Sequence, residues 1–255
     1  MENSNQSSKI LLVTGGSRGI GKSIAINAAK RGIGVILTYN KNPEMGKTVA
    51  AGINESGGKA VALHLDTSAV GTFDNFNQEI MSVLKKNWGR DNLDFLINNA
   101  GIAQRSLISD TTEAIFDQLV NINFKGVFFL TQKLLPLITD GGHVLNISSA
   151  LARVSFPASA VYGALKAGIE TLTRYFAKEF AARKIRFNSV APGAIDTEFG
   201  GGKGDEAHRR QIAEATVLGR LGEADDIGLF VASLLSDDTR FLNAQRIEVS
   251  GGIMI

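Results

Sequence analysis

Short runs of apolar, often β-branched residues recur along the chain, and segments with apolar residues at helical spacing separate them. The runs predict seven strands, near residues 9–14, 33–39, 60–65, 93–98, 143–148, 185–190 and 245–249. Strands that alternate with helices are typical of a doubly wound parallel sheet. We therefore expect an α/β fold with one seven-stranded parallel sheet, helices on both of its faces, and a single domain over residues 1–255.

Two of the helical patterns are unusually long, at about residues 111–137 and 158–182. Both are apolar over more of their surface than packing on one face of a sheet requires. Their large apolar residues fit either a core or a contact between subunits; they include Phe128, Phe129, Leu134 and Leu137. The chain also ends in apolar residues, which is unusual for an exposed terminus.

The composition excludes several classes of function. The formal charge is only +2, and the Lys and Arg residues are dispersed, so we expect no nucleic-acid surface. There is no cysteine, and His64, His143 and His208 are not at ligand spacing, so we expect no metal site. The polar start lacks the layout of a signal peptide, and no apolar run reaches membrane-spanning length. The cytoplasm is the expected location.

A glycine-rich stretch, Thr14-Gly-Gly-Ser-Arg-Gly-Ile-Gly21, joins the first predicted strand to the first helix. Without Cβ atoms, Gly15, Gly19 and Gly21 allow a tight turn, and backbone N–H groups can approach a pyrophosphate at the positive end of the helix. The spacing is G-x-x-x-G-x-G and not the commoner G-x-G-x-x-G. A flexible loop is the alternative, but the position between strand and helix favours a phosphate-binding turn.

Tyr162 and Lys166 lie four residues apart in a helical pattern, so their side chains share one face. A nearby ammonium favours the phenolate, and we expect it to lower the phenol pKa from its usual value of about 10. Ser149 follows a predicted strand and could hold a substrate oxygen while Tyr162 gives or takes a proton. An ordinary amphipathic helix with a surface lysine is the alternative for the pair alone.

Several separate motifs carry a resemblance to a known family. They are T-G-x-x-x-G-x-G from Thr14, N-N-A-G from Asn98, V-N-I-N ending at Asn123, a serine thirteen residues before Y-x-x-x-K, and P-G-x-I-x-T from Pro192. From about Lys9 to Gly252 the chain resembles the short-chain dehydrogenase/reductase family, in its single-domain branch with a Rossmann-like fold. Within it, the chain resembles the 3-oxoacyl-(acyl-carrier-protein) reductases, although Ala244 stands where that group usually has glycine.

The resemblance implies a catalytic set and its roles. Tyr162 is the general acid in carbonyl reduction and the general base in alcohol oxidation, and Lys166 lowers its pKa and holds the nicotinamide ribose. Ser149 orients and polarises the substrate oxygen. Asn123 disrupts its own helix to hold a water molecule that relays protons through Lys166. This route requires no metal.

The cofactor expected is NADP(H), with NAD(H) as the alternative. An NAD-binding site of this kind has an acidic residue at the end of the second strand, whereas here Tyr39, Asn40 and Lys41 follow that strand. Arg18 is at a position where family members that use NADPH carry a basic residue. The resemblance also implies that Asp66 and Thr67 contact the adenine. The full expected set is Gly15, Ser17, Arg18, Gly19, Ile20, Gly21, Tyr39, Asn40, Lys41, Asp66, Thr67, Asn98, Ala100, Gly101, Tyr162, Lys166, Pro192, Gly193, Ile195 and Thr197.

The leading functional hypothesis is NADPH-dependent reduction of a ketone or β-ketoacyl carbonyl to a secondary alcohol. The alternatives are an alcohol or sugar dehydrogenase that works in the oxidative direction and, more remotely, a non-catalytic cofactor sensor.

We expect a substrate lid at about residues 193–220, in which a glycine-rich loop precedes a polar helix over 206–215. The expected pocket draws on residues 103–106 and 151–156 and on Phe199, and Arg105 or Arg153 could meet an acidic or carrier-bound substrate. The family resemblance implies a homotetramer, with a dimer as the second possibility.

Overall fold

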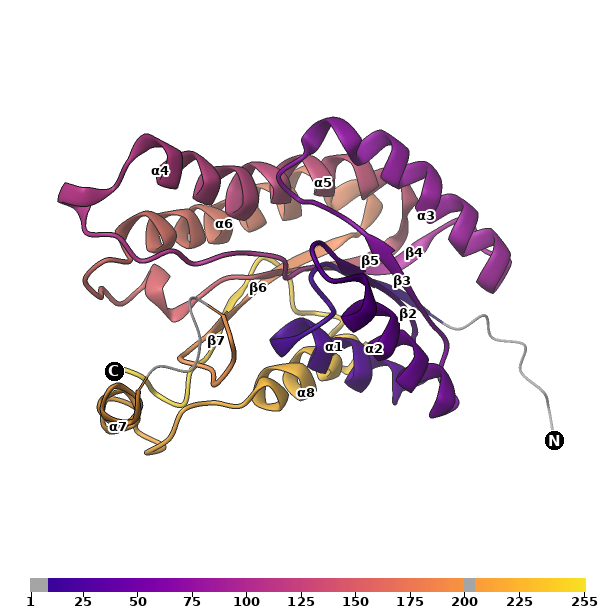
Figure 1. The fold of residues 1–255 in the computed structure, drawn as a ribbon. Coiled ribbons are helices and arrows are strands. Elements are labelled where there is room, and N and C mark those ends of the chain that lie inside the picture. The colour runs from indigo at the N-terminus through magenta and orange to yellow at the C-terminus, as the bar shows by residue number, and fades with distance from the viewer. Residues whose placement is uncertain (1–8, 200–204) are drawn as a thin grey trace.

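The computed structural model describes residues 9–199 and 205–255 (Figure 1). These residues form a seven-stranded, fully parallel sheet in the order β3-β2-β1-β4-β5-β6-β7. The strands are β1 Ile10–Val13, β2 Gly34–Tyr39, β3 Ala60–His64, β4 Leu93–Asn98, β5 Ile138–Ile147, β6 Arg186–Pro192 and β7 Arg246–Val249. The strand order reverses between β1 and β4, and ligands bind beyond the carboxyl edge at such a point. The predicted doubly wound sheet is confirmed.

Helices cover both faces of the sheet, as Figure 1 shows, with α3 to α6 on one face and α1, α2 and α8 on the other. Successive strand residues point to opposite faces, so Leu12 joins the core under α3 and α5 while Leu11 joins the core under α1 and α8. The helices are α1 Gly19–Ala29, α2 Pro43–Glu55, α3 Phe73–Trp88, α4 Glu113–Val120, α5 Gly126–Leu134, α6 Ala160–Glu179, α7 Glu206–Glu214 and α8 Ala224–Leu234.

The long helix predicted at 111–137 is interrupted in the structure. A π-helical segment, Asn121–Lys125, separates α4 from α5, and a short 3₁₀ turn follows α5. Leu134 and Leu137 are buried, and Phe128 and Phe129 pack partly buried against the same core, so these four residues belong to the core of the chain.

The fifth strand begins earlier than its apolar pattern predicted, at Ile138 and not at residue 143. Gly141, with φ +79°, lies in this added part, and the pairing with β4 shifts register between Leu93 and Phe95. The polar residues there hid the strand because they sit at the exposed, irregular start of the pairing.

The segment after β6 is anchored at two places. Ile195 pairs with Gly222 in an isolated bridge, and Thr216 pairs with Ile253 near the C-terminus. The predicted polar helix is present as α7, whereas residues 200–204 of the expected lid lie outside the described residues. In the described ranges, every helix is too short or too polar to cross a membrane.

Candidate active site

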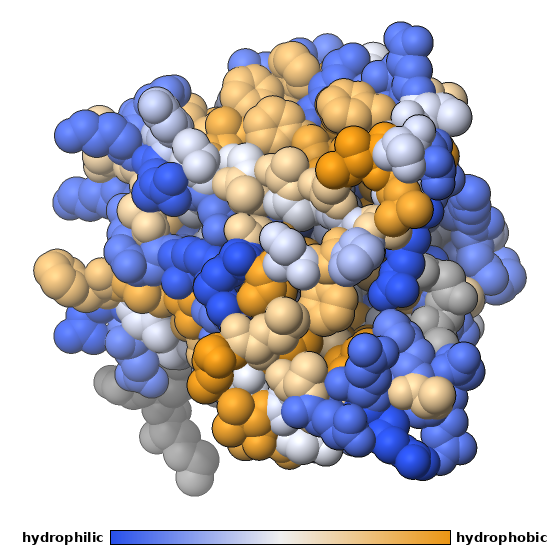
Figure 2. Space-filling view, turned by 90° about the vertical axis from the view of Figure 1, so that its left-hand side faces the viewer, coloured by the Kyte–Doolittle hydropathy of each residue, from blue (hydrophilic) through white to orange (hydrophobic). Residues whose placement is uncertain are grey.

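A cleft of about 1380 Å³ opens at the carboxyl edge of the sheet. Its walls come from the β1–α1 turn, the ends of β2, β4, β5 and β6, and the N-terminal part of α6. Figure 2 shows the side of the molecule that carries α7 and the C-terminus, where apolar side chains occupy the middle and hydrophilic groups flank them. The cleft therefore has the position that the doubly wound sheet predicts for a ligand.

The glycine turn is held by residues from neighbouring strands. The Gly15 N–H donates to the Thr38 hydroxyl at 3.1 Å. The Thr14 hydroxyl accepts from the N–H groups of Asn99 and Ala100 at 3.0 and 2.9 Å, and the Asn99 amide donates to Thr14 O at 2.9 Å. Thr38 and Asn99 are site residues that the sequence pattern did not predict, although Asn99 lies inside the N-N-A-G motif.

The geometry of this turn fits a pyrophosphate. Gly15 has φ +65°, and a Cβ on Gly21 would lie 2.3 Å from Gly15 O, so both positions require glycine. Helix α1 begins here, and within the described chain Arg18 at its N-cap makes no side-chain capping bond. The first turn carries no acidic residue, so its N–H groups and positive dipole end remain available to an anion.

Tyr162 and Lys166 are both buried in the N-terminal half of α6, at 7% and 5% exposure. The Lys166 Nζ donates to Ile147 O at 2.8 Å and lies 5.5 Å from the centroid of the Tyr162 ring. Ser149 hydrogen-bonds to the Tyr162 phenol. The structure thus brings Ser149, Tyr162 and Lys166 together at one wall of the cleft.

The pKa of Tyr162 moves in the direction opposite to our expectation. Burial raises the pKa of the phenol, and the hydrogen bond from Ser149 offsets only part of that effect. Burial also lowers the pKa of Lys166 to about 8. The spacing of the two residues indicated only the attraction of the ammonium for a phenolate, whereas in the structure the loss of solvent around the buried phenol is the larger effect.

Asn123 lies behind the cleft and is fully buried in the π-helical segment. Its amide donates to Ile102 O and Leu119 O, each at 3.0 Å, and its Oδ1 accepts from the Ile102 N–H at 3.2 Å. A Cβ on Gly101 would lie 2.8 Å from Asn123 Oδ1 and 3.8 Å from Lys166 Nζ. A side chain at position 101 would therefore press against the Asn123 amide, so this position requires glycine.

At the far end of the cleft, the wall is lined by Tyr39, which ends β2, and by Asn40 and Lys41, which follow it. The Tyr39 ring packs beside Gly46 of α2 and meets His64 edge-on at 5.9 Å. Arg18 also lines the cleft, and it forms an ion pair with Glu198 at 3.2 Å.

Other residues of the expected cofactor set also line the cleft. They are Ser17, Gly19, Ile20, Thr67, Ala100, Gly101, Pro192, Gly193, Ile195 and Thr197.

Two residues of the expected cofactor set do not line the cleft as the structure describes it. The Asp66 carboxylate accepts from the Ser68 N–H and hydroxyl at 2.9 and 2.7 Å. The Asn98 amide donates to Thr131 at 2.9 Å and to Asn146 at 2.8 Å, inside the layer between sheet and helices. Asn98 therefore joins β4, β5 and α5, and its position at a strand end did not reveal that inward orientation.

The cleft end beside Tyr162 is mostly apolar. Phe199 lies with its ring centroid 6.1 Å from that of Tyr162. The other apolar residues there are Leu151, Val154, Phe156, Ile212 and Ile253. Arg153, considered above as a contact for an acidic substrate, instead binds Glu248 and the carbonyl oxygens of residues 253 and 254.

Comparisons with known proteins agree with this geometry. The family model described as enoyl-(acyl carrier protein) reductase matches residues 15–254. A 3-oxoacyl-[acyl-carrier-protein] reductase of Staphylococcus aureus is 35% identical over 247 residues, which cover 96% of this chain and 98% of that protein. The structure of a short-chain dehydrogenase/reductase from Serratia marcescens matches with a TM-score of 0.89 at 29% identity, covering 97% of this chain and 98% of that one.

The angucycline C-6 ketoreductase LanV, solved with bound NADP, matches with a TM-score of 0.92 at 32% identity, covering 96% of this chain and 95% of that one. The fold is thus shared with proteins that are matched over nearly their whole length. The chain belongs to the short-chain dehydrogenase/reductase family and is an oxidoreductase of that family.

Proposed function

We propose that this protein reduces a ketone or β-ketoacyl carbonyl to a secondary alcohol with NADPH. The observation that carries the proposal is the convergence of Ser149, Tyr162 and Lys166 on a cleft whose other end is the glycine turn, the proposed phosphate site. When bound, NADPH supplies the hydride that adds to the carbonyl carbon. The chain itself has to bind and orient the substrate and deliver one proton to the carbonyl oxygen.

Tyr162 is the proposed proton donor. Because burial raises the pKa of its phenol, the side chain holds its proton at neutral pH until negative charge develops on the substrate oxygen. Ser149, which hydrogen-bonds to the same phenol, donates to that oxygen and helps to stabilise the charge. Proton transfer from Tyr162 completes the alcohol and leaves a phenolate.

Lys166 and Asn123 are the proposed route for returning the proton. The pKa of Lys166, lowered to about 8 by burial, lies close to neutral pH, where a group gives and takes protons readily. Gly101, which carries no Cβ, lies beside both Lys166 Nζ and Asn123 Oδ1 at the wall of the cleft. A water molecule there would link the phenolate, through the lysine, to the cleft.

The proposed preference for NADPH rests on the end of the cleft near β2. A carboxylate at that place would repel a 2′-phosphate, and the chain has Tyr39, Asn40 and Lys41 instead. Lys41 and Arg18 would attract the phosphate. Thr67 and the neighbouring Asp66 remain the proposed contacts of the adenine.

The substrate class is proposed from the apolar end of the cleft and from the relatives. An acyl chain or a fused aromatic ketone would fit beside Phe199, Phe156 and Ile253. Arg105 also lines the cleft and remains a candidate contact for an acyl carrier. Residues 193–220 remain the proposed lid, the homotetramer remains the proposed assembly before a dimer, and the cytoplasm remains the proposed location.

The deciding experiment measures NADPH and NADH oxidation by the purified protein with a panel of carbonyl compounds. The panel contains a β-ketoacyl thioester, β-ketoesters, α-diketones, quinones and ketosugars, together with an enoyl thioester because the matched family model carries that description. We expect turnover with NADPH that is lost in Tyr162→Phe. Turnover with NADH alone would overturn the cofactor proposal, and tight NADPH binding with no turnover would favour a sensing role.

A further inference from the structure

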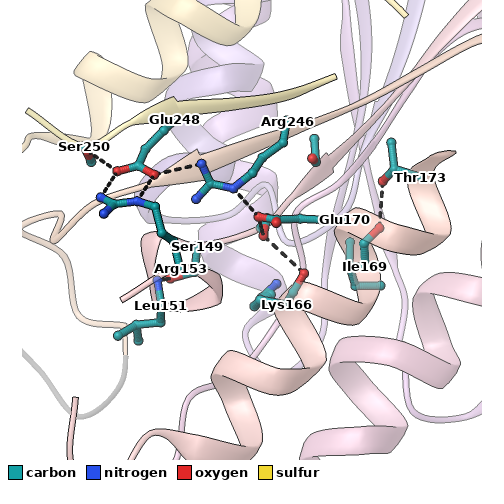
Figure 3. Close-up of polar contacts among 12 residues, drawn as sticks. Ser149, Leu151, Arg153, Lys166, Ile169, Glu170, Thr173, Arg246, Glu248 and Ser250 are labelled. Carbon is teal, nitrogen blue, oxygen red and sulfur yellow. Dashed lines mark hydrogen bonds and ion pairs between the residues drawn. The ribbon is translucent and has the colours of Figure 1, made fainter. Parts of the chain in front are cut away.

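A network of half-buried ion pairs lies beside Ser149, the proposed catalytic serine. Figure 3 shows Arg246 between two carboxylates, with its Nε 2.8 Å from Glu170 and its Nη1 2.8 Å from Glu248. Glu248 in turn is held by the guanidinium of Arg153 through two contacts of 2.9 and 2.7 Å. The four side chains are between 11% and 38% exposed.

The two ends of this network contact the residues before and after Ser149 in the sequence. At one end, the Ser148 hydroxyl donates to Glu170 at 2.7 Å and lies 3.3 Å from the backbone oxygen of Lys166. At the other end, Arg153 closes a tight turn in which its N–H donates to Ala150 O at 2.8 Å. Ser149 therefore sits on a short segment tied to α6 before it and to β7 after it.

The same contacts reach Lys166, on the helix that also carries Tyr162. Glu170 lies one helical turn after Lys166 on α6, and Ser148 touches both residues. The contacts join β7, α6 and the segment around Ser149, although these elements are far apart in the sequence. A shift of β7 or loss of one link would move Ser149 relative to the phenol to which it hydrogen-bonds.

Stability alone is a poor explanation for these residues. Half-buried ion pairs lose in desolvation much of what they gain in attraction. Within the described residues, the buried Nη2 of Arg246 has no hydrogen-bond partner. The network thus holds the Arg246 guanidinium at a place where one of its donors has no partner in the part of the chain that the structure describes. Fixing the relative positions of the joined elements explains these residues better than stability does.

We propose that Arg246 and the carboxylates of Glu170 and Glu248 act as positioning residues that fix Ser149 against Tyr162 and Lys166. The proposal deepens the proposed function, because it assumes that these three residues perform the proton transfer. Arg246 is the centre of the arrangement, since it alone contacts both carboxylates among the residues that Figure 3 labels. None of the positioning residues touches the substrate in this scheme.

The first test removes one link without leaving a charge unpaired. In Ser148→Ala, Glu170 keeps Arg246, but the segment before Ser149 loses its tie to α6. We expect kcat with the best carbonyl substrate to fall about tenfold or more while KM and the NADPH Kd change less than about twofold. Arg246→Met removes the guanidinium that contacts both Glu170 and Glu248, and it should lower kcat further.

A second readout does not depend on turnover. With ¹³C-labelled tyrosine, the ring signal of Tyr162, assigned by Tyr162→Phe, reports the hydrogen bond from Ser149. We expect both variants to shift this signal in the folded protein. Two variants serve as controls. Ser233→Ala removes the hydrogen bond of a serine hydroxyl on α8. Arg90→Met breaks a similarly buried ion pair with Asp94, which lies near the start of β4 and away from the cleft. Neither control should shift it.

An unchanged Tyr162 signal in folded Ser148→Ala and Arg246→Met would overturn the positioning role, whatever their activity. Equal loss of kcat in Arg90→Met would also overturn it, because the effect would then follow general stability. Absence of turnover in the unmodified protein would count against the proposed function and would leave the spectroscopic test intact.

Discussion

Arg18 and Glu198, 180 residues apart in the sequence, form an ion pair of 3.2 Å between the glycine turn and the segment after β6. Both residues line the cleft. The guanidinium that we propose as a contact of the 2′-phosphate thus already faces a carboxylate. The phosphate and Glu198 would compete for it.

Replacing Glu198 by Gln should therefore strengthen NADPH binding. The two side chains are 60% and 70% exposed, and an exposed ion pair contributes up to about 1 kcal/mol, so we expect a decrease in Kd of up to about fivefold at low salt. NADH binding should not change, because NADH lacks the competing phosphate. Fluorescence titration measures both constants, with Glu179→Gln on the exposed end of α6 as the control for net charge. An equal gain for NADH would contradict the competition.

Gly21→Ala should weaken binding of either nicotinamide cofactor. The new Cβ would lie 2.3 Å from Gly15 O and 2.5 Å from the Asn99 amide, so the turn that presents its N–H groups must move. We expect a loss of affinity of at least about tenfold by titration. Gly52→Ala in α2 is the matched control, because nothing lies within 4 Å of its added methyl group. Retained affinity in Gly21→Ala would show that the turn does not bind the cofactor.

Ala244→Gly should stabilise the protein. Ala244 has φ +59°, a left-handed conformation that costs a residue with a Cβ about 1–2 kcal/mol. Glycine removes this strain, but it has more freedom in the unfolded chain and lacks the methyl group that packs against the core, so the expected net gain is at most about 1 kcal/mol. Urea denaturation measures it, and a free energy of unfolding that stays the same or falls would contradict it.

The reverse substitution supplies the comparison. Gly219 has φ +68° and open space around it, so Gly219→Ala should lose about the same amount through backbone strain alone.

His143 should make the stability depend on pH below neutrality. It is fully buried in β5, and burial, with a smaller effect of the Arg186 charge, lowers its pKa from 6.5 to about 3. Its contribution is therefore fully present above pH 6.5. As the pH falls from 6.5 toward 3, the unfolded chain takes up the proton and the folded chain does not, so stability decreases by up to about 1.4 kcal/mol per pH unit.

Chemical denaturation at several pH values tests this dependence. His143→Gln keeps an acceptor for the Asn188 amide, which lies 2.8 Å from the ring nitrogen, and should flatten the decrease. His64→Gln, on an exposed side chain, should not. A slope that is the same in all three proteins would exclude His143 as its source.

Much of the fold and part of the candidate site follow from local sequence patterns. The alternation of apolar runs and helical patterns predicted all seven strands and the helices on both faces, because each element buries a face set by its own periodicity. The glycine turn and the pair Tyr162 and Lys166 are local as well, since their spacing alone brings their groups together. The burial of His143 could not be predicted, because a residue at the end of a predicted strand can be either buried or exposed.

Tertiary structure alone decided the environment of those groups. Desolvation by distant elements reversed the expected direction of the Tyr162 pKa and lowered that of Lys166 to about 8. Arg153 was a candidate substrate contact in the sequence and is bound to Glu248 in the structure. Such pairs join residues that are far apart along the chain, and a polar residue in a sequence does not reveal which partner folding places against it. Local periodicity determines the elements, whereas packing between them determines charge, orientation and partners.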